Sequence, residues 1–281
     1  MLLKGGLIGN MIPVIFIHKG YQPYLEFTLK KALEKNNVTF ISDNIPPFFN
    51  PKLKLENYNK LSQGFDNLKN NYVHLNTTPF DYELFCFQRW FILRNYMKKN
   101  NLDVVFYVDS DVLLFCDVNE EWEKYKQYDF TLLHRSAATS SFITMRGIDS
   151  FCDMLENLYS DKNSYLFLKM ESHFNVRQKC GLPGGVCDMT ALELFHYNDD
   201  IGGGPGRVGE MMQIIDDTTY DHNINTPDQD FEFENGVKKV EIINKLPYVL
   251  NKKTNKKILF NCLHFQGGAK NYIKQIYDRT H

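Results

Sequence analysis

The hydrophobic and polar positions in the first half of the chain follow two different periods. Residues 14–17, 38–42 and 104–108 are short β-branched or aromatic runs, the pattern of strands buried on both faces. Residues 24–35 and 81–99 have apolar side chains every three or four positions, which predicts amphipathic helices. Strands separated by helical crossovers predict the α/β class, with a mixed, mostly parallel sheet flanked by helices.

The second half has a mixed pattern and ends in a β-rich part. Residues 46–78 show no clear period, and we expect only short elements there. No internal repeat, low-complexity tract or linker interrupts the sequence, so a single domain over residues 1–281 is expected. The further elements that we expect are strands at 130–133 and 141–145, helices at 150–159, 189–195 and 269–277, and several strands within 237–265.

Composition excludes several classes of protein. Hydrophobic residues make up 43% and charged residues 23% of 281, close to ordinary globular values. The 32 basic and 34 acidic residues nearly cancel, so general attraction to nucleic acid is not expected. No apolar run reaches the roughly 20 residues of a membrane helix. The N-terminal apolar run lacks a cleavage site and is expected to be a short leader before the first strand, which favours a cytoplasmic protein.

The six cysteines show no CxxC spacing. We interpret them as free thiols in a reducing compartment, most of them buried. A pairing of Cys180 with Cys187, or shared metal binding by these two, is the alternative.

Polar side chains directly follow three of the predicted strands. These residues are His18, Asp43 and Asp109. Ligands of a parallel sheet bind beyond the carboxyl ends of its strands, so we expect the three side chains to surround one crevice. Asp43 could accept a hydrogen bond from a base or a ribose there. A turn or cap in the sequence SDN explains the same residue equally well.

A second aspartate, Asp111, stands two positions after Asp109. Two carboxylates at a strand end can hold a hard divalent cation that bridges phosphate oxygens, although a solvated turn is the common alternative. Near the other end of the chain, His264 offers an imidazole as a third ligand for manganese. Gly267 lets the backbone approach a phosphate, and Lys270 supplies a point charge. The alternatives are that His264 is a core histidine and that Lys270 is a solvated lysine. The upstream aspartates favour a metal and diphosphate site over these alternatives.

These two segments together resemble a known family. VFYVDSDVLLF combined with LHFQGGAK is similar to glycosyltransferases of the GT-A (Rossmann-like) fold, and the second segment resembles the His-x-x-Gly-x-x-Lys element of glycogenin-like and bacterial galactosyltransferase-like enzymes. Asn271 and Tyr272 replace the usual Pro-Trp after the lysine. The resemblance implies a nucleotide-binding half, residues 1–115, and an acceptor-binding half, residues 116–281.

The resemblance also implies roles for individual residues. Asp109, Asp111 and His264 would bind Mn²⁺ (or Mg²⁺), and Gly267 and Lys270 would contact the donor diphosphate. Besides these, the donor-binding set would comprise His18, Asp43, Arg89 and Ser110.

Arg89 and Asp188 have competing explanations. By resemblance, a basic residue on the helix at 81–99 reaches the donor, but Arg89, like Arg94, could instead pair with a surface carboxylate. Asp188 follows a glycine-rich turn and would be the catalytic residue. It would accept a hydrogen bond from the acceptor or donor sugar, or act as general base in an inverting enzyme. An N-cap of the following helix is its alternative.

We therefore expect a metal-dependent glycosyltransferase of the hexosyltransferase type (EC 2.4). The donor would be a UDP-sugar and the acceptor a glycan or a lipid-linked sugar, as in polysaccharide biosynthesis. A divalent ion and a lysine would stabilise the departing diphosphate. Membrane contact would be at most peripheral, at the inner face, where the lysines of KKTNKK could touch anionic lipid; a solvated turn is the alternative.

Two other functions compete with this expectation. In a haloacid-dehalogenase-like phosphohydrolase, Asp109 would be the nucleophile and Asp111 the acid/base, with magnesium alongside. More than a hundred residues precede the motif, whereas that family opens with it, and residues 264–270 would have no role. A carbohydrate- or nucleotide-binding protein without turnover would use the same groups, and the intact ligand set argues against it.

Overall fold

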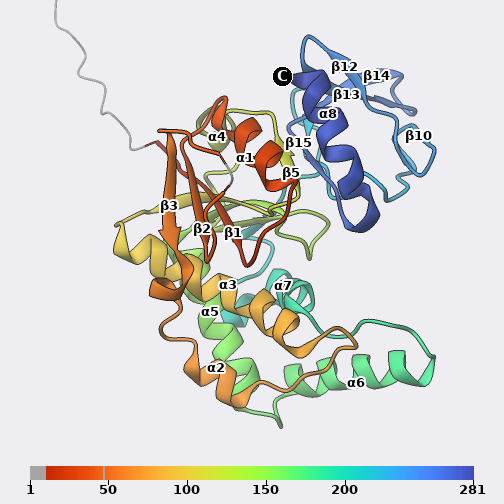
Figure 1. The fold of residues 1–281 in the computed structure, drawn as a ribbon. Coiled ribbons are helices and arrows are strands. Elements are labelled where there is room, and N and C mark those ends of the chain that lie inside the picture. The colour runs from red at the N-terminus through yellow and green to blue at the C-terminus, as the bar shows by residue number, and fades with distance from the viewer. Residues whose placement is uncertain (1–10, 47) are drawn as a thin grey trace, which may run out of the picture.

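A computed structural model describes residues 11–46 and 48–281 and has a mixed α/β fold (Figure 1). Its central sheet has seven strands in the order β3-β2-β1-β4-β7-β6-β8. Strand β7 is antiparallel to its neighbours β4 and β6, and the other pairs are parallel. The expected mostly parallel sheet flanked by helices is therefore confirmed. The strands are β1 (Val14–His18), β2 (Val38–Ser42), β3 (Leu53–Asn57), β4 (Val104–Val108), β6 (Phe130–Leu132), β7 (Ser140–Thr144) and β8 (Val208–Glu210).

Helices cover both faces of this sheet because its strands are apolar on both sides. Along β1, Ile15 and Ile17 belong to one buried cluster with helices α3 (Phe80–Lys99), α5 (Met145–Ser160) and α7 (Asp188–His196). Val14 and Phe16 belong to a second cluster, which includes α1 (Leu25–Leu33) and residues of α4 (Val118–Trp122). The alternation along one strand thus positions helices on both sides.

The C-terminal part is β-rich, as expected, and it returns to the central sheet. Strand β15 (Cys262–His264) pairs antiparallel with β5 (Val112–Leu114), which follows β4, and His264 lies opposite Val112. A four-stranded sheet in the order β12-β13-β14-β9 follows, and its strands β13 and β14 form a third buried cluster with α8 (Ile273–Thr280) and the β5–β15 pair. The remaining strands here are β9 (Thr218–Thr219), β10 (Phe233–Glu234), β11 (Val237–Lys238), β12 (Glu241–Ile243), β13 (Leu246–Asn251) and β14 (Lys256–Phe260).

Two elements differ from the expectation. Residue 46 and residues 48–78 hold only short elements, but one of them, β3, extends the central sheet at its edge. Helix α6 (Tyr165–Lys179) was not expected, because only Phe167 and Met170 of its side chains are buried. The leader expected at residues 1–10 lies outside the described residues. The other short elements are η1 (Tyr58–Leu61), α2 (Asp66–Asn71), η2 (Asp199–Ile201) and η3 (Gly267–Tyr272).

Two further expectations concern the cysteines and the membrane. All six cysteines are free thiols; Cys180 is exposed, Cys187 is half-buried, and the two are not bonded. Within residues 11–46 and 48–281, no helix combines the length and the apolarity that crossing a bilayer requires.

Candidate active site

A cavity of about 580 Å³ opens beyond the carboxyl ends of β1 and β4. Six residues expected from the sequence line it: His18, Arg89, Asp109, Ser110, Asp111 and Lys270. Because β1 and β4 are neighbouring parallel strands, the residues that follow them meet at one edge of the sheet.

Asp109, Asp111 and His264 form a group that could hold a metal ion. One ligand atom from each residue lies within 4.8 Å of the others. The pairing of β5 with β15 creates this group, since it places His264 beside the turn that carries the two aspartates. Two carboxylates and an imidazole are a donor set that suits Mn²⁺ or Mg²⁺. The residues present therefore fit a divalent cation.

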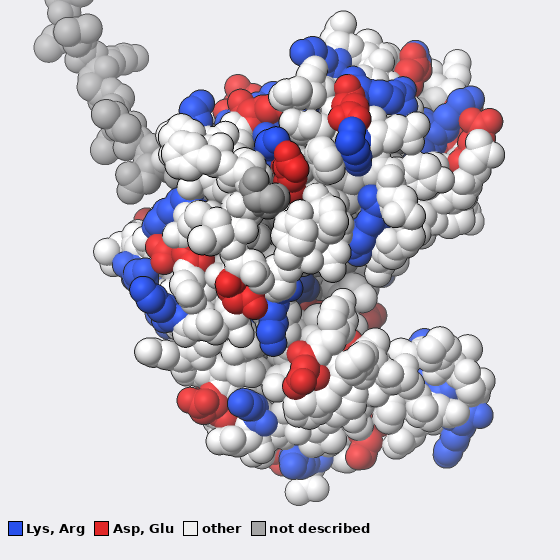
Figure 2. Space-filling view, viewed as in Figure 1, with Lys and Arg blue, Asp and Glu red and all other residues white. Residues whose placement is uncertain are grey.

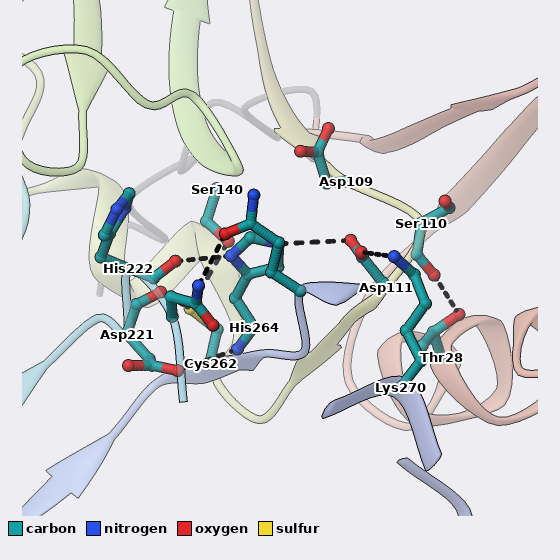
Figure 3. A network of polar contacts seen from close by, with 12 residues as sticks. Thr28, Asp109, Ser110, Asp111, Ser140, Asp221, His222, Cys262, His264 and Lys270 are labelled. Carbon is teal, nitrogen blue, oxygen red and sulfur yellow. Dashed lines mark hydrogen bonds and ion pairs between the residues drawn. The ribbon is translucent and has the colours of Figure 1, made fainter. Parts of the chain in front are cut away.

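The imidazole of His264 is oriented by the backbone. Its Nδ1 donates a hydrogen bond to the carbonyl of His222, which leaves Nε2 facing Asp111 at 3.4 Å (Figure 3). A ligating histidine needs this tautomer, with the distal nitrogen free to donate its lone pair. Burial alone would lower the pKa of His264, but the neighbouring Asp111 carboxylate raises it to about 9. A metal ion would replace that proton.

Asp111 is also paired with the C-terminal lysine. Lys270 Nζ lies 2.8 Å from Asp111 Oδ2, and the lysine side chain is one-third exposed (Figure 3). Burial opposes the charged carboxylate, but His264 and Lys270 together lower the pKa of Asp111 to about 2. Gly267, at the start of the same 3-10 turn, has a φ of +58°, and the space beside it is open. The backbone there adopts a conformation that favours glycine.

A buried ion pair supports His264 from behind. Asp221 accepts a hydrogen bond from the backbone N–H of His264 at 3.0 Å, and Lys238 Nζ lies 2.9 Å from the Asp221 carboxylate. Both side chains are almost inaccessible to solvent, at 0% and 5% exposed. Lys238 also donates to the carbonyl of Asn223, whose amide donates to Gln266. Sequence reasoning missed these residues, because they stand in no motif and far apart along the chain.

Arg89 connects the aspartates of two different elements. Its guanidinium donates to Asp109 at 2.7 Å, to the Tyr107 hydroxyl at 3.0 Å and to Asp188 at 2.6 Å. The Tyr107 hydroxyl also donates to Asp109. Arg94, by contrast, pairs with Asp153 and Glu156, which is the surface pairing considered for it from the sequence.

The Asp188 carboxylate is turned toward the protein interior. Asp188 is the first residue of α7, and Cys187 occupies the N-cap position, so the alternative that Asp188 itself is the N-cap is wrong. Its side chain is 5% exposed and accepts hydrogen bonds from Arg89 and Trp90. Asp188 is not among the residues that line the cavity. Its expected catalytic role stays a prediction.

The remaining expected donor contacts divide into two groups. His18 lines the cavity, and its Nδ1 lies 3.0 Å from the hydroxyl of Ser110. Asp43 is exposed, accepts a hydrogen bond from the backbone of Gly20 at 2.8 Å, and is not among the lining residues. The geometry of Asp43 is that of a turn.

Several lining residues were not expected from the sequence. Tyr82, Phe85 and Cys86 recur with the expected Arg89 at three- and four-residue steps along α3, and all four line the cavity. The apolar period of this helix predicts an amphipathic helix but does not assign these three side chains to a site. Their spacing relative to Arg89 is the feature of the sequence that could have placed them on the same side of the helix as the expected donor contact. The remaining lining residues are Ile17, Lys19, Gln22, Tyr24 and Asp81.

Comparisons with known proteins give structural similarities only. No family model matches the sequence, and no curated protein sequence matches it. Among solved structures, an active-site mutant of LgtC is 11% identical, with 95% of each chain covered and a TM-score of 0.47. Mouse xyloside xylosyltransferase 1 is 7% identical, over 71% of this chain and 84% of that one, with a TM-score of 0.46.

The glycosyltransferase GlyE from Streptococcus pneumoniae is 13% identical, over 72% of this chain and 45% of its own, with a TM-score of 0.38. Each of these TM-scores is below 0.5.

Proposed function

We propose that this protein is a metal-dependent glycosyltransferase of the GT-A kind, which moves a sugar from a UDP-sugar to a glycan or lipid-linked acceptor. The observation that carries the proposal is the group Asp109, Asp111 and His264, with Lys270 beside it, at the edge of a 580 Å³ cavity. In this proposal, residues 1–115 and 116–281 are the nucleotide-binding and acceptor-binding halves of one domain.

The chemistry of the transfer matches the groups that the site contains. Glycosyl transfer develops negative charge on the departing nucleoside diphosphate, and a bound Mn²⁺ or Mg²⁺ supplies positive charge to those oxygens. Lys270 is partly exposed, so its ammonium can leave Asp111 for an incoming diphosphate while staying in the site. The open backbone at Gly267 allows the same phosphates to approach closely.

The rest of the cavity would hold the nucleoside and the sugar. Tyr24 and Phe85 offer aromatic faces for a base, and His18 and Ser110 offer polar atoms for a ribose. Arg89 lines the cavity while being anchored to Asp109 and Asp188, so its position is fixed before the donor binds. Asp188 would then act by positioning Arg89, and retention of configuration would require no general base.

The C-terminal segment favours transfer over phosphate hydrolysis. The phosphohydrolase alternative gives His264 and Lys270 no role, yet both contact Asp111. That alternative also makes Asp109 a nucleophile, and Arg89 and Tyr107 both donate hydrogen bonds to the same oxygen of Asp109. Such bonds stabilise the carboxylate and reduce its nucleophilicity.

A thermal-shift panel tests the proposal. Nucleotides and nucleotide sugars are added to the protein with Mn²⁺ or with a chelator, because a ligand of the native state raises its melting temperature. We expect UDP or a UDP-sugar to raise the melting temperature only with Mn²⁺, and Asp111→Asn to abolish the shift. Asp217→Asn, at an aspartate that is 62% exposed, is the matched control and should respond like the wild type.

The same panel also defines the results that would contradict the proposal. No response to any nucleotide, together with a response to Mg²⁺ plus a phosphate mimic, would contradict the transferase and support the phosphohydrolase. Where a UDP-sugar does bind, release of UDP in the presence of acceptor glycans distinguishes turnover from binding alone.

A further inference from the structure

Helix α6 packs on the protein through one narrow side only. It has 15 residues, yet Phe167 and Met170 are its only side chains that are fully buried. In Figure 1 it forms the lower right edge of the molecule, beyond α2 and α5. Most of the surface of α6 is therefore available to a partner outside the described chain.

The side of α6 opposite to these contacts has a distinct composition. Tyr165, Leu168 and Val176, which follow one another at steps of three and eight residues, lie on this side and are 77%, 48% and 57% exposed. Lys169 and Lys179 lie on the same side and are exposed. We call these five residues the α6 face. The only carboxylate residue of the helix, Glu171, lies off this face and is half-buried.

The lysines of the α6 face form no ion pair within the described part of the chain, and Lys169 shares a hollow of about 410 Å³ against α7 with Glu193. Neither Lys169 nor Lys179 forms an ion pair with any carboxylate of residues 11–46 and 48–281. Figure 2 shows the corresponding lower right edge mostly white, with blue at its outer end. An apolar strip that carries unpaired lysines matches an anionic surface.

The turn between β13 and β14, which the sequence suggested as a lipid contact, differs in this respect. Three of its four lysines, Lys253, Lys256 and Lys257, pair with Asp230, Asp217 and Glu241, and the fourth, Lys252, is exposed. Their charges are compensated by neighbouring carboxylates, and no exposed apolar strip accompanies them. These three ion pairs favour a solvated turn, which was the alternative considered for it.

We propose that α6 docks the α6 face on the surface of an anionic lipid bilayer. An interfacial helix buries its apolar side chains at the level of the headgroups, and flanking lysines extend to the lipid phosphates. Each basic residue near such a surface adds attraction that salt weakens. A protein partner fits the face less well, because lysine is depleted from the centres of protein interfaces. The inference does not depend on the proposed sugar transfer.

Vesicle co-sedimentation tests the inference on the full chain. The vesicles are phosphatidylcholine, alone or with about 30% phosphatidylglycerol. We expect the wild type to bind the anionic vesicles at least tenfold more tightly than neutral ones, and to be released by salt. Lys169→Glu/Lys179→Glu and Leu168→Glu/Val176→Glu should each weaken binding at least tenfold. Melting temperatures close to that of the wild type would show that both variants are folded.

Lys253→Glu/Lys256→Glu makes the same charge change in the β13–β14 turn and should bind within about twofold of the wild type. The inference is overturned if the wild type stays in the supernatant, or if the α6 variants bind as it does. It is also overturned if only the turn variant loses binding, which would make the turn the lipid contact. A monomer-to-dimer change that Leu168→Glu/Val176→Glu abolishes, without vesicle binding, would instead identify the α6 face as a contact between two copies of the chain.

Discussion

The Asp221 carboxylate accepts a hydrogen bond from the backbone N–H of His264 at 3.0 Å. The carbonyl of the next residue, His222, accepts a second hydrogen bond from the imidazole of His264. The main chain and the ring of His264 are thus both held by one short segment. Lys238 compensates the charge of Asp221 inside the protein, so the orientation of His264 depends on a residue that is not itself a ligand.

The first prediction concerns a variant that lacks the charge of Lys238 beside Asp221. Lys238→Met leaves the buried Asp221 carboxylate without its charged partner, and we expect the free energy of unfolding to fall by about 3–5 kcal/mol. The affinity for Mn²⁺ should fall about 10- to 100-fold, because the ligand loses its preset orientation. Urea unfolding and a metal titration followed by tryptophan fluorescence measure the two effects.

Two controls separate stability from metal binding. Lys238→Arg keeps the charge and should retain most of both properties. Asp221→Leu/Lys238→Met removes the unpaired charge, so it should regain stability but not metal affinity. Wild-type affinity in this folded double variant would show that the pair does not position His264.

The second prediction concerns pH in the metal-free protein. The pKa of His264 is raised from 6.5 to about 9, so its contribution to stability is complete below pH 6.5 and is lost as the pH rises through 9. The pKa of Asp111 is lowered from 3.8 to about 2, so its contribution is lost as the pH falls from 3.8 through 2. We expect the pair to stabilise the fold most between about pH 4 and 6.5.

Unfolding by urea in the presence of a chelator, at pH 6.5 and pH 9, measures the stability that is lost as His264 gives up its proton. We expect a loss on the order of 1–3 kcal/mol from this pair. His264→Gln removes the titrating group and should show a smaller loss. An equal pH dependence in this variant and in the wild type would contradict the assignment. Saturating Mn²⁺ should also reduce the loss, since the ion replaces the proton.

The third prediction distinguishes a positioning role for Asp188 from a general base. Asp188→Asn keeps an acceptor but removes the negative charge that holds Arg89. We expect the KM for the donor to rise about tenfold, with the shape of the kcat–pH profile unchanged. A general base would instead give a loss of about 10²- to 10⁴-fold in kcat and a missing acidic limb. Asp153→Asn is the control. Asp153 is the exposed partner of Arg94, which lies on α3 like Arg89, and this variant should leave both parameters unchanged.

The fourth prediction concerns the segment that leads into α7. A Cβ at Gly185 would lie 2.2 Å from the carbonyl oxygen of Leu75, so Gly185→Ala requires the backbone to move. We expect a loss of about 1–3 kcal/mol in the free energy of unfolding. Gly206→Ala is the matched control, because nothing lies within 4 Å of its added Cβ, and it should change stability by less than about 0.5 kcal/mol. Equal effects of the two substitutions would contradict the close contact.

Features of the fold that depend on a short segment of sequence could be predicted. The run at 104–108 forms β4 because it is apolar on both sides, and the two aspartates follow it at the sheet edge where ligands bind. Edge strand β3 was missed as a strand because its sequence, LKLEN, is half exposed and carries lysine and glutamate. Helix α6 was missed for a related reason, since little of its surface is buried.

The support of the site was not predictable in the same way. Asp221 and Lys238 come close to His264 only in the folded chain, because neither stands near Asp109, Asp111 or His264 in the sequence. The burial of Asp188 likewise depends on the approach of α3 and α7, which no periodicity within one segment reveals.

The β5–β15 pair has a consequence for folding as well as for chemistry. The group of Asp109, Asp111 and His264 is completed only when a strand from the middle of the chain meets one that is synthesised much later. Contacts between such distant segments form slowly, because a long loop must close first. Tight Mn²⁺ binding would therefore report the completion of folding: a refolding chain would gain its secondary structure first and its affinity for the ion last.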